Sequence, residues 1–361
     1  MEIFRFLLLP LSLFYGFVVK VRNNLFDWKV LPSEKFDLTV ISVGNLVAGG
    51  SGKTPLVEYI IRLLGESSNI ATLSRGYRRK TKGYRLAGQD ESGETLGDEP
   101  MQYHTKFGNV HVAVSENRRK GIRRLMKSIN ALEAIILDDA FQHRYVKPGL
   151  SILVTDYYHT YRHDWLLPVG RLREHKSGSK RADIIVVTKT PRIFSPIVRK
   201  QMLTELNPLP AQLVCFSYIN YLNLMPVYKS NDDLRSKTEN IYSIILLTGI
   251  ANPGPIEEYL KRLCSDLELM GFSDHHEFSE KELGLVRKKF EALPSKRKII
   301  VTTEKDAMRL HNPGSESILG DLPIFYIPIA FEFHPVDKEL FDTTVKAYVM
   351  GQKNQGTKGG N

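Results

Sequence analysis

The chain has 361 residues, a formal net charge of +10 and a pI of about 9.3. One hydrophobic core rarely serves a chain of this length, so we expect two domains. The positive charge favours an anionic partner. The two cysteines, Cys215 and Cys264, stand far apart in no metal or redox spacing, which argues against a disulfide framework and for a reducing compartment.

Residues 4–19 form an apolar stretch with a single charge, and Pro10 interrupts it. The stretch is shorter than the roughly 20 residues that a spanning helix needs. A signal peptide would end in a small-x-small cleavage site, but Lys20 and Arg22 follow instead. We therefore expect residues 1–25 to form a helix in the membrane interface, with the two basic residues near the head groups. A buried core helix is the alternative.

Strand-like and helical segments alternate along residues 26–222. Short apolar, β-branched runs predict strands at 38–43, 70–73, 110–114, 134–137, 152–154 and 184–187. Helical spacing predicts helices at 54–64, 118–129 and 196–206. Such alternation predicts an α/β fold with a parallel sheet covered on both faces.

The second half of the chain repeats the alternation after a polar stretch at 223–240, which we interpret as a linker. Beyond it we expect strands at 243–247, 299–302 and 324–327, and helices at 255–263, 280–293 and 335–349. These elements predict a second, smaller α/β domain over 241–350. The tail 351–361 has no apolar residue, so we expect it to be disordered.

The segment AGGSGKT, residues 48–54, follows a predicted strand and opens a predicted helix, as a P-loop does. Glycines let backbone N–H groups turn towards phosphate oxygens, and the helix N-terminus adds partial positive charge. Lys53 would reach the β- and γ-phosphates, and Thr54 would bind Mg²⁺. A glycine-rich turn with a surface lysine is the alternative. The predicted nucleotide-binding residues are Val47, Ala48, Gly49, Gly50, Ser51, Gly52, Lys53 and Thr54.

The spacing of this loop is unusual because Val47 stands where the first P-loop glycine is expected. The loop instead matches the GGxGKT form found in relatives of the nitrogenase iron protein. The activating lysine of that class is replaced here by Ala48, so we do not expect its trans-lysine mechanism.

A predicted strand ends in two carboxylates, Asp138 and Asp139, and Gln142 and His143 follow closely. At the carboxyl end of a strand beside a P-loop, such an acid binds Mg²⁺ directly or through water. Adjacent acids on an extended chain point to opposite faces, so both need not contact the metal. A solvated strand end is the alternative.

Two further patterns carry candidate acid–base groups. The turn at 97–100 holds Asp98 and Glu99, and the second domain holds Asp274-His275-His276. A histidine paired with an aspartate can take a proton from a sugar hydroxyl near neutral pH. A metal site or an exposed loop would explain the second pattern equally well.

Basic residues gather in three clusters, at 75–82, 118–127 and 171–181. A solvated face is the usual explanation for such a run. Three clusters beside an apolar N-terminus better suit anionic lipid head groups or a phosphorylated substrate. We expect no nucleic-acid partner, because no reader helix or pattern of stacking aromatic residues is present.

Eight motifs, in order across nearly the whole chain, resemble the tetraacyldisaccharide 4'-kinase family of the lipid A pathway. They are the apolar N-terminus, VGN leading into GGSGKTP (43–55), SRGY (74–77), GDEP (97–100), DDAFQH (138–143), LLPVGRLRE (166–174), DHH (274–276) and TEKDA (303–307). The departures are mild. Ala140-Phe141 stands where the family often has Gly-Leu or Gly-Phe, and Arg171 where many members have proline.

The resemblance implies γ-phosphoryl transfer from ATP, with Mg²⁺, to the 4'-hydroxyl of a tetraacyldisaccharide 1-phosphate, which forms lipid IVA. It implies a peripheral or monotopic enzyme on the cytoplasmic face of a Gram-negative inner membrane, with no obligate protein partner. Asp98, supported by His275, would accept the hydroxyl proton, and Lys53 would neutralise phosphate charge. The implied metal-side residues are Thr54, Asp138, Asp139, Gln142 and Glu174. The implied substrate-side residues are Asn45, Tyr77, Glu99, Arg118, His143, Arg171 and Arg173.

Three other classes of protein remain open. A P-loop GTPase or ATPase switch of the metal-insertion or partitioning type would act through a partner, but Ala48 and the missing Asn-Lys-x-Asp guanine reader weaken it. Residues 187–190 are a faint echo of that reader. A soluble coenzyme kinase would not need the apolar N-terminus. A membrane scaffold without activity would leave Lys53, Thr54 and Asp139 without a role.

Overall fold

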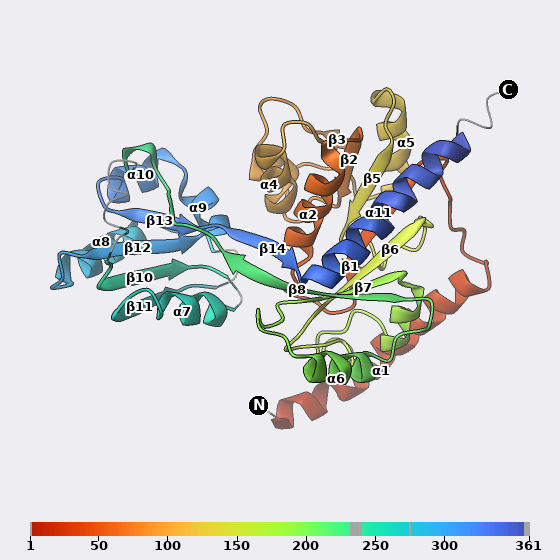
Figure 1. Ribbon diagram of the computed structural model, residues 1–361, viewed down its shortest axis with the longest axis horizontal. Coiled ribbons are helices and arrows are strands. Elements are labelled where there is room, and N and C mark those ends of the chain that lie inside the picture. The colour runs from red at the N-terminus through yellow and green to blue at the C-terminus, as the bar shows by residue number, and fades with distance from the viewer. Residues whose placement is uncertain (1, 232–237, 239, 251, 274–275, 357–361) are drawn as a thin grey trace. The chain divides into compact units, whose positions relative to one another are not determined.

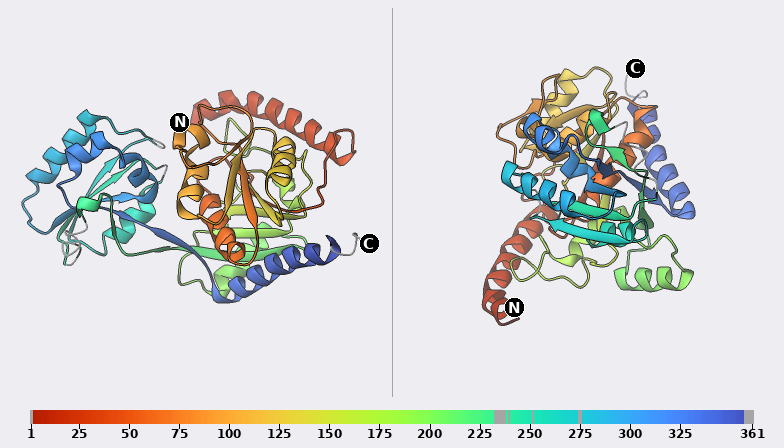
Figure 2. Two further views of the ribbon diagram at one scale, coloured as in Figure 1. Left: turned by 90° about the horizontal axis from the view of Figure 1, so that it is seen from above. Right: turned by 90° about the vertical axis from the view of Figure 1, so that its left-hand side faces the viewer.

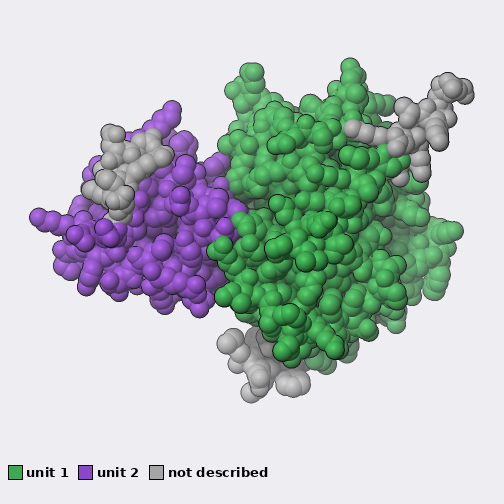
Figure 3. Space-filling model, viewed as in Figure 1, with its two compact units in different colours: residues 1–219, 331–361 green, residues 220–330 purple. Residues whose placement is uncertain are grey.

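The structure is a computed structural model that describes residues 2–231, 238, 240–250, 252–273 and 276–356. The chain divides into two compact units (Figure 3). Unit 1 comprises residues 1–219 and 331–361, and unit 2 comprises residues 220–330. Two units were expected from the length of the chain.

Unit 1 is built on a sheet of nine strands within the described residues, in the order β14-β8-β7-β6-β1-β5-β2-β4-β3 (Figure 1). The strands are β1 (Thr39–Asn45), β2 (Ile70–Ser74), β3 (Arg85–Leu86), β4 (His111–Val114), β5 (Ala134–Asp138), β6 (Leu150–Asp156), β7 (Ile184–Thr188), β8 (Leu213–Tyr221) and β14 (Ile329–Phe333). The central strands pair in parallel, and β3 pairs antiparallel with β4. The predicted parallel α/β sheet is therefore confirmed.

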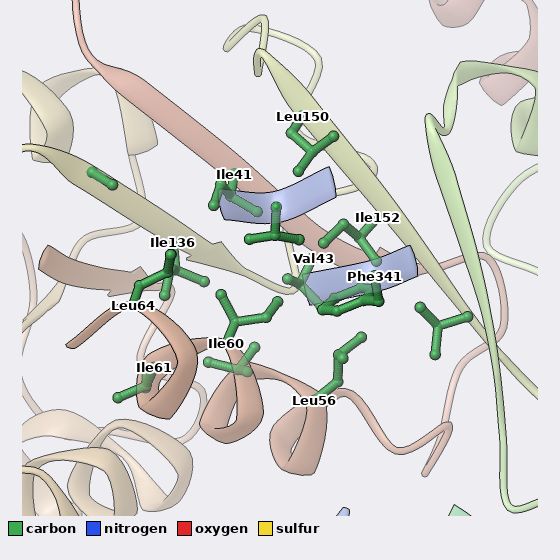
Figure 4. Close-up of a cluster of buried hydrophobic side chains, with 14 of the residues drawn as sticks. Ile41, Val43, Leu56, Ile60, Ile61, Leu64, Ile136, Leu150, Ile152 and Phe341 are labelled. Carbon is green, nitrogen blue, oxygen red and sulfur yellow. The ribbon is translucent and has the colours of Figure 1, made fainter. Parts of the chain in front are cut away.

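Helices cover both faces of this sheet. They are α1 (Glu2–Asp27), α2 (Lys53–Gly65), α3 (Gly93–Leu96), α4 (Asp98–Lys106), α5 (Arg118–Ser128), the 3₁₀ helix η1 (Lys176–Arg181), α6 (Pro196–Leu206) and α11 (Pro335–Gly356). Successive residues of a strand point to opposite faces. Ile41 of β1 accordingly packs under α2 and α11 (Figure 4). Val40 packs on the face that α5 covers.

Unit 2 is a second α/β unit with a five-stranded sheet within the described residues, in the order β11-β10-β12-β13-β9. Its elements are β9 (Met225–Pro226), β10 (Ser243–Thr248), α7 (Gly254–Leu260), β11 (Asp266–Gly271), α8 (Glu280–Ala292), β12 (Lys298–Thr303), α9 (Glu304–Leu310), α10 (Pro313–Leu319) and β13 (Ile324–Ile327). The first four strands of that order pair in parallel, and β9 pairs antiparallel at the edge.

Two expected boundaries differ from the structure. Part of the predicted linker 223–240 belongs to unit 2, since β9 pairs with β13 and the Asn231 side chain is fully buried. Proline is tolerated in β9 because it is an edge strand. The predicted helix at 335–349 exists as α11, but Phe341 and Val345 pack with Ile41 of β1, so it belongs to unit 1 and not to the smaller domain.

The predicted disordered tail also differs in part. Helix α11 continues to Gly356, so the first six residues of the segment 351–361 are helical. Residues 357–361 lie outside the described part of the chain.

The N-terminal helix α1 packs along unit 1, on a different side from α11 (Figure 2). Ser12 Oγ donates to the Leu166 carbonyl at 2.9 Å, and Tyr15 OH to the Arg173 carbonyl at 2.7 Å. On the outer side, Phe14 and Phe17 are 68% and 65% exposed, so the alternative of a buried core helix is wrong. No helix in the described part of the chain is long and apolar enough to cross a membrane.

Candidate active site

The predicted motifs of unit 1 meet at the carboxyl edge of its sheet. Strand β1 lies between β5 and β6, and all three run in parallel. In this register Val43 pairs with Asp138, and Asn45 pairs with Val154. The loop after β1 therefore lies beside Asp138, at the edge where parallel α/β sheets bind ligands.

Two glycine conformations and one buried side chain hold the shape of this loop. Gly49 and Gly52 adopt φ values of 108° and 82°, which favour glycine. The Asn45 side chain is fully buried, and its Nδ2 donates to the Val47 carbonyl at 2.5 Å and to Ser51 Oγ at 2.8 Å. Asn45 was predicted to contact the substrate; its burial corrects this, because the amide is used to hold the loop.

Asp139 forms ion pairs with two cations. Lys53 Nζ lies 3.5 Å from Asp139 Oδ1, and Arg173 Nη1 donates to both carboxylate oxygens at 2.9 Å. Burial opposes ionisation, but Lys53 and Arg173 lower the pKa of Asp139 below its ordinary value. Asp139 is thus ionised and pairs with Lys53 when no nucleotide is bound, and both of its oxygens already accept hydrogen bonds. Of the two adjacent acids, it fits a metal less well.

Asp138 is fully buried, and only one of its two carboxylate oxygens accepts a hydrogen bond within the described residues. Its Oδ2 accepts from Tyr103 OH at 3.2 Å, while Oδ1 has no hydrogen-bond partner within the described residues. Burial, followed by the charges of Glu99 and Asp139, raises the pKa of Asp138 to about 7. An unpaired buried carboxylate oxygen beside a second acid is what a bound cation would satisfy.

Glu99 completes this acidic group. Thr54 Oγ1 donates to Glu99 Oε1 at 2.8 Å, so the carboxylate lies on the metal side of the loop and not on the predicted substrate side. In the described part of the chain, no three His, Cys, Asp or Glu side chains are grouped to hold a metal on their own. Mg²⁺ usually takes one or two carboxylates together with substrate phosphates. Here Glu99 and Asp138 could provide the carboxylates, and Thr54 a hydroxyl.

Glu174 and Gln142, both predicted near the metal, are occupied by donors. Glu174 is 1% exposed and accepts from Asn23 at 2.9 Å, Arg181 at 2.8 Å and Gln142 at 3.1 Å. Gln142 Nε2 also donates to the Asn45 carbonyl at 2.7 Å. These contacts connect α1 to the phosphate loop and do not fit metal coordination in this arrangement.

The predicted substrate-side arginines and tyrosine occupy different environments. Arg118 is 3% exposed, and burial lowers its pKa to about 10. Its guanidinium donates to the Ser115 carbonyl at 2.7 Å and the Asp138 carbonyl at 3.3 Å, so it supports the end of β5. Tyr77 is 66% exposed, and Arg171 Nε pairs with Asp164 Oδ2 at 3.0 Å. Of these three, Tyr77 and Arg171 remain open to a substrate.

Asp98 is the first residue of α4 and is exposed. Helix α4 is tied to α2 because Glu58, which is 4% exposed, accepts from Gln102 at 2.7 Å and Lys106 at 2.9 Å. The neighbouring Glu99 bonds Thr54, so Asp98 stands next to the phosphate loop. The structure therefore places the start of α4, where Asp98 lies, beside the phosphate loop, which sequence spacing could not do.

The histidines of unit 2 are described only in part. His275, the predicted support of Asp98, lies outside the described residues, so its role stays a prediction. His276 Nε2 lies 3.1 Å from Glu282 Oε1, and its ring stacks on Phe272 at 4.7 Å between centroids.

His143 is held neutral at the site. Burial, and then the charge of Arg118, lower the pKa of His143 to about 4 from 6.5. Its Nε2 is buried without a hydrogen-bond partner in the described part of the chain. Near pH 7 the His143 ring would contact a substrate as a neutral hydrogen-bond donor or acceptor and not as a cation.

This depressed pKa predicts a loss of stability in acid. Between pH 6.5 and 4 the unfolded chain binds a proton that the folded chain does not, so stability is lost as pH falls through this window. We expect the His143→Gln variant to lose less stability than the wild type between pH 7 and pH 4.5. Thermal unfolding at a series of pH values measures this, with His159→Gln, an exposed histidine, as control. Parallel curves for wild type and His143→Gln would contradict it.

Comparisons with known proteins identify the family of this chain. A family model described as Tetraacyldisaccharide-1-P 4'-kinase matches residues 4–349. The chain belongs to this family. The Tetraacyldisaccharide 4'-kinase of Bacteroides thetaiotaomicron is 45% identical over 352 residues, covering 95% of this chain and 92% of that protein. That of Flavobacterium psychrophilum is 43% identical and covers 99% of this chain and all of that protein.

A solved structure matches the fold over nearly its whole length. It is LpxK from Aquifex aeolicus in complex with ATP, with a TM-score of 0.72, 28% sequence identity, and coverage of 96% of this chain and 99% of that chain. The predictions of a P-loop α/β fold and of a kinase of this family are confirmed. The rival P-loop switch is not supported.

Sequence reasoning missed several residues of this edge. Tyr103 bonds Asp138, and Thr188 and Lys189 bond the phosphate loop. The only signal for the last two was the faint guanine-reader pattern at 187–190. Tyr103 carried no signal, because nothing in a helical tyrosine indicates that it faces a carboxylate.

Proposed function

We propose that this kinase transfers the γ-phosphate of ATP to the 4'-hydroxyl of a tetraacyldisaccharide 1-phosphate, forming lipid IVA. The observation that carries the proposal is the group of Lys53, Thr54, Glu99 and Asp138 at one edge of the sheet, around a glycine loop. Asp98 directly precedes Glu99 at the start of α4. Phosphoryl transfer depends on positioning and on neutralising charge, and this edge offers both.

The residues divide into four roles. Lys53 leaves Asp139 for the β- and γ-phosphates, and Arg173 keeps Asp139 paired when it does so. Thr54, Glu99 and Asp138 hold Mg²⁺, which supplies charge neutralisation on the phosphates when it is bound. Asp98 accepts the proton of the attacking hydroxyl. Tyr77 and Arg171 contact the substrate.

A product assay tests the function directly. The full chain is incubated in detergent with labelled ATP, Mg²⁺ and a disaccharide lipid monophosphate. We expect a labelled bisphosphate lipid. ATP hydrolysis that a protein partner stimulates, without any lipid product, would overturn the proposal and favour the P-loop switch.

The base is tested separately. We expect Asp98→Asn to lower kcat about 100-fold, the lower range for loss of a general base, with little change in ATP binding. The variant keeps the size of the side chain at the start of α4. Equal losses of turnover and of ATP affinity would remove Asp98 from the role of base.

We further propose that α1 places the enzyme on the cytoplasmic leaflet of the inner membrane. Its outer face carries Leu13, Phe14 and Phe17, each about two-thirds exposed, and Lys20 lies exposed one turn further on. An apolar face bordered by basic residues suits the interface of an anionic bilayer.

Vesicle binding tests this face. Replacing Phe14 and Phe17 together by serine should reduce sedimentation with anionic phospholipid vesicles at least about ten-fold, since burial of each ring contributes roughly 1.5–3 kcal/mol. The control is serine at Val336 and Leu340, exposed apolar residues of α11. Equal binding by the two double variants would contradict the role of α1.

A further inference from the structure

Two consecutive carbonyls of the phosphate loop accept hydrogen bonds from the last residue of β7 and from the residue that follows it. Lys189 Nζ donates to the Gly50 carbonyl at 2.6 Å, and Thr188 Oγ1 donates to the Ser51 carbonyl at 2.7 Å. Thr188 is the last residue of β7, and its hydroxyl lies farther from its other acceptor, the Thr155 carbonyl, at 3.2 Å. A hydroxyl has one proton, so the shorter contact with Ser51 takes it.

Lys189 is itself fixed in place. Its ammonium lies 2.7 Å from Asp156 Oδ2, at the end of β6, and Asp156 pairs in register with Thr188. Lys189 also adopts φ 59°, a left-handed conformation that is costly for a residue with a side chain. An ion pair and a strained backbone at one residue show that its ammonium is placed on the loop by the ends of two neighbouring strands.

Peptide geometry links these contacts to phosphate binding. A peptide unit is planar and trans, so the carbonyl of one residue and the N–H of the next point in opposite directions. A hydroxyl that holds the Ser51 carbonyl therefore turns the Gly52 N–H away from β7. Gly52 is the residue before helix α2, whose N-terminus faces the proposed phosphate site.

We propose that Thr188 and Lys189 are positioning residues that hold the phosphate loop in the shape that receives ATP, by fixing the Gly50 and Ser51 carbonyls outward. This rests on the proposed role of residues 49–54 in binding the ATP phosphates. The two side chains act through the loop and do not contact the phosphates. They set the affinity for ATP, while Lys53 and Asp98 carry the transfer.

Thr188 also packs against the loop, so its hydroxyl and its methyl group have to be tested separately. A methyl group built on Gly52 would meet Thr188 Oγ1 at 3.2 Å and its Cγ2 at 3.3 Å, so loop and side chain are in close contact. Valine would preserve this volume and remove the hydroxyl, whereas serine would keep the hydroxyl and remove the methyl group. Comparing the valine and serine variants separates the effect of the hydrogen bond from that of the methyl contact.

The experiment compares Thr188→Val with Thr188→Ser in the full chain. We expect the valine variant to raise the Kd and the KM for ATP about ten-fold, the effect of one lost hydrogen bond to a buried carbonyl. The KM for the lipid should stay close to that of the wild type. We expect the serine variant to bind ATP nearly as the wild type does. Equal weakening in both variants, or none in the valine variant, would overturn the proposal.

Lys189→Gln provides a second, independent test. The side chain of Lys189 is 29% exposed, so its replacement is not expected to prevent folding even if Thr188→Val does. It should also weaken ATP binding about ten-fold with the lipid KM unchanged. Wild-type ATP affinity in this variant would overturn the role of Lys189.

Lys53→Ala, measured in parallel for ATP binding, keeps the two proposals apart. Normal ATP binding by Lys53→Ala would mean that the loop does not hold the phosphates. Weak binding by Lys53→Ala together with wild-type binding by Thr188→Val and Lys189→Gln would reject the positioning role alone.

Discussion

Replacing Lys53 by alanine is expected to lower kcat for lipid phosphorylation about 1,000-fold, the upper range for loss of one preorganised electrostatic group. Lys53 opens helix α2 and lies 3.5 Å from Asp139. When ATP is bound, its ammonium would face charge that builds up between the β- and γ-phosphates. The fold should survive, because Asp139 keeps its two contacts with Arg173.

The measurement is a full set of kinetic constants for ATP and lipid, with the melting temperature of each variant. Lys338→Ala is the matched control, since Lys338 is an exposed lysine of α11 in the same unit. A decrease of less than ten-fold in kcat for Lys53→Ala, at unchanged stability, would show that another cation neutralises the phosphates.

Replacing Asp138 by asparagine should also lower kcat about 1,000-fold at saturating ATP and raise the Mg²⁺ concentration needed for half-maximal activity. Asparagine has the size of aspartate and can still accept from Tyr103, so the loss would come from the missing charge. Asp90→Asn, in an exposed loop, is the control. If Asp138→Asn keeps its turnover and its Mg²⁺ requirement, Asp138 does not hold the metal.

The same variant should be more stable than the wild type without Mg²⁺. Burial, with the charges of Glu99 and Asp139, raises the pKa of Asp138 from 3.8 to about 7. As pH rises from 3.8 to about 7, the unfolded chain loses a proton that the folded chain retains, so the wild type loses stability across this window. Asp138→Asn lacks this loss. Its melting temperature should exceed that of the wild type by a margin that grows to about pH 7 and then levels off.

The sequence alone determined six strands of the sheet described in unit 1, namely β1, β2, β4, β5, β6 and β7, whereas β3, β8 and β14 were not predicted. A strand buried on both faces is mostly apolar, and β5 and β7 are therefore visible as apolar runs that end in one polar residue, while β1 is a largely apolar, β-branched run. The phosphate loop was equally visible, because a tight turn around phosphate requires glycines at fixed positions before Lys53. Such local requirements are written in consecutive residues.

Tertiary structure decided which residues meet at the site. Helix α4 is held against α2, so Glu99 contacts Thr54 and does not lie on the predicted substrate side. Glu174 is enclosed by donors from three segments, and Asn45 is turned beneath the loop. A sequence does not show which partner a carboxylate or amide will have, so the role of the side chain depends on what the fold places within hydrogen-bond distance.

The same contrast separates the phosphate loop from its support. The glycines, Lys53 and Thr54 are adjacent in the chain and were identified from the sequence. Thr188 and Lys189 lie more than 130 residues away, and only the parallel order β1-β6-β7 brings them to the Gly50 and Ser51 carbonyls. The sequence thus determined that the chain has a phosphate loop, whereas tertiary structure decided what holds it in shape, because backbone carbonyls are alike in every sequence and only the fold selects their partners.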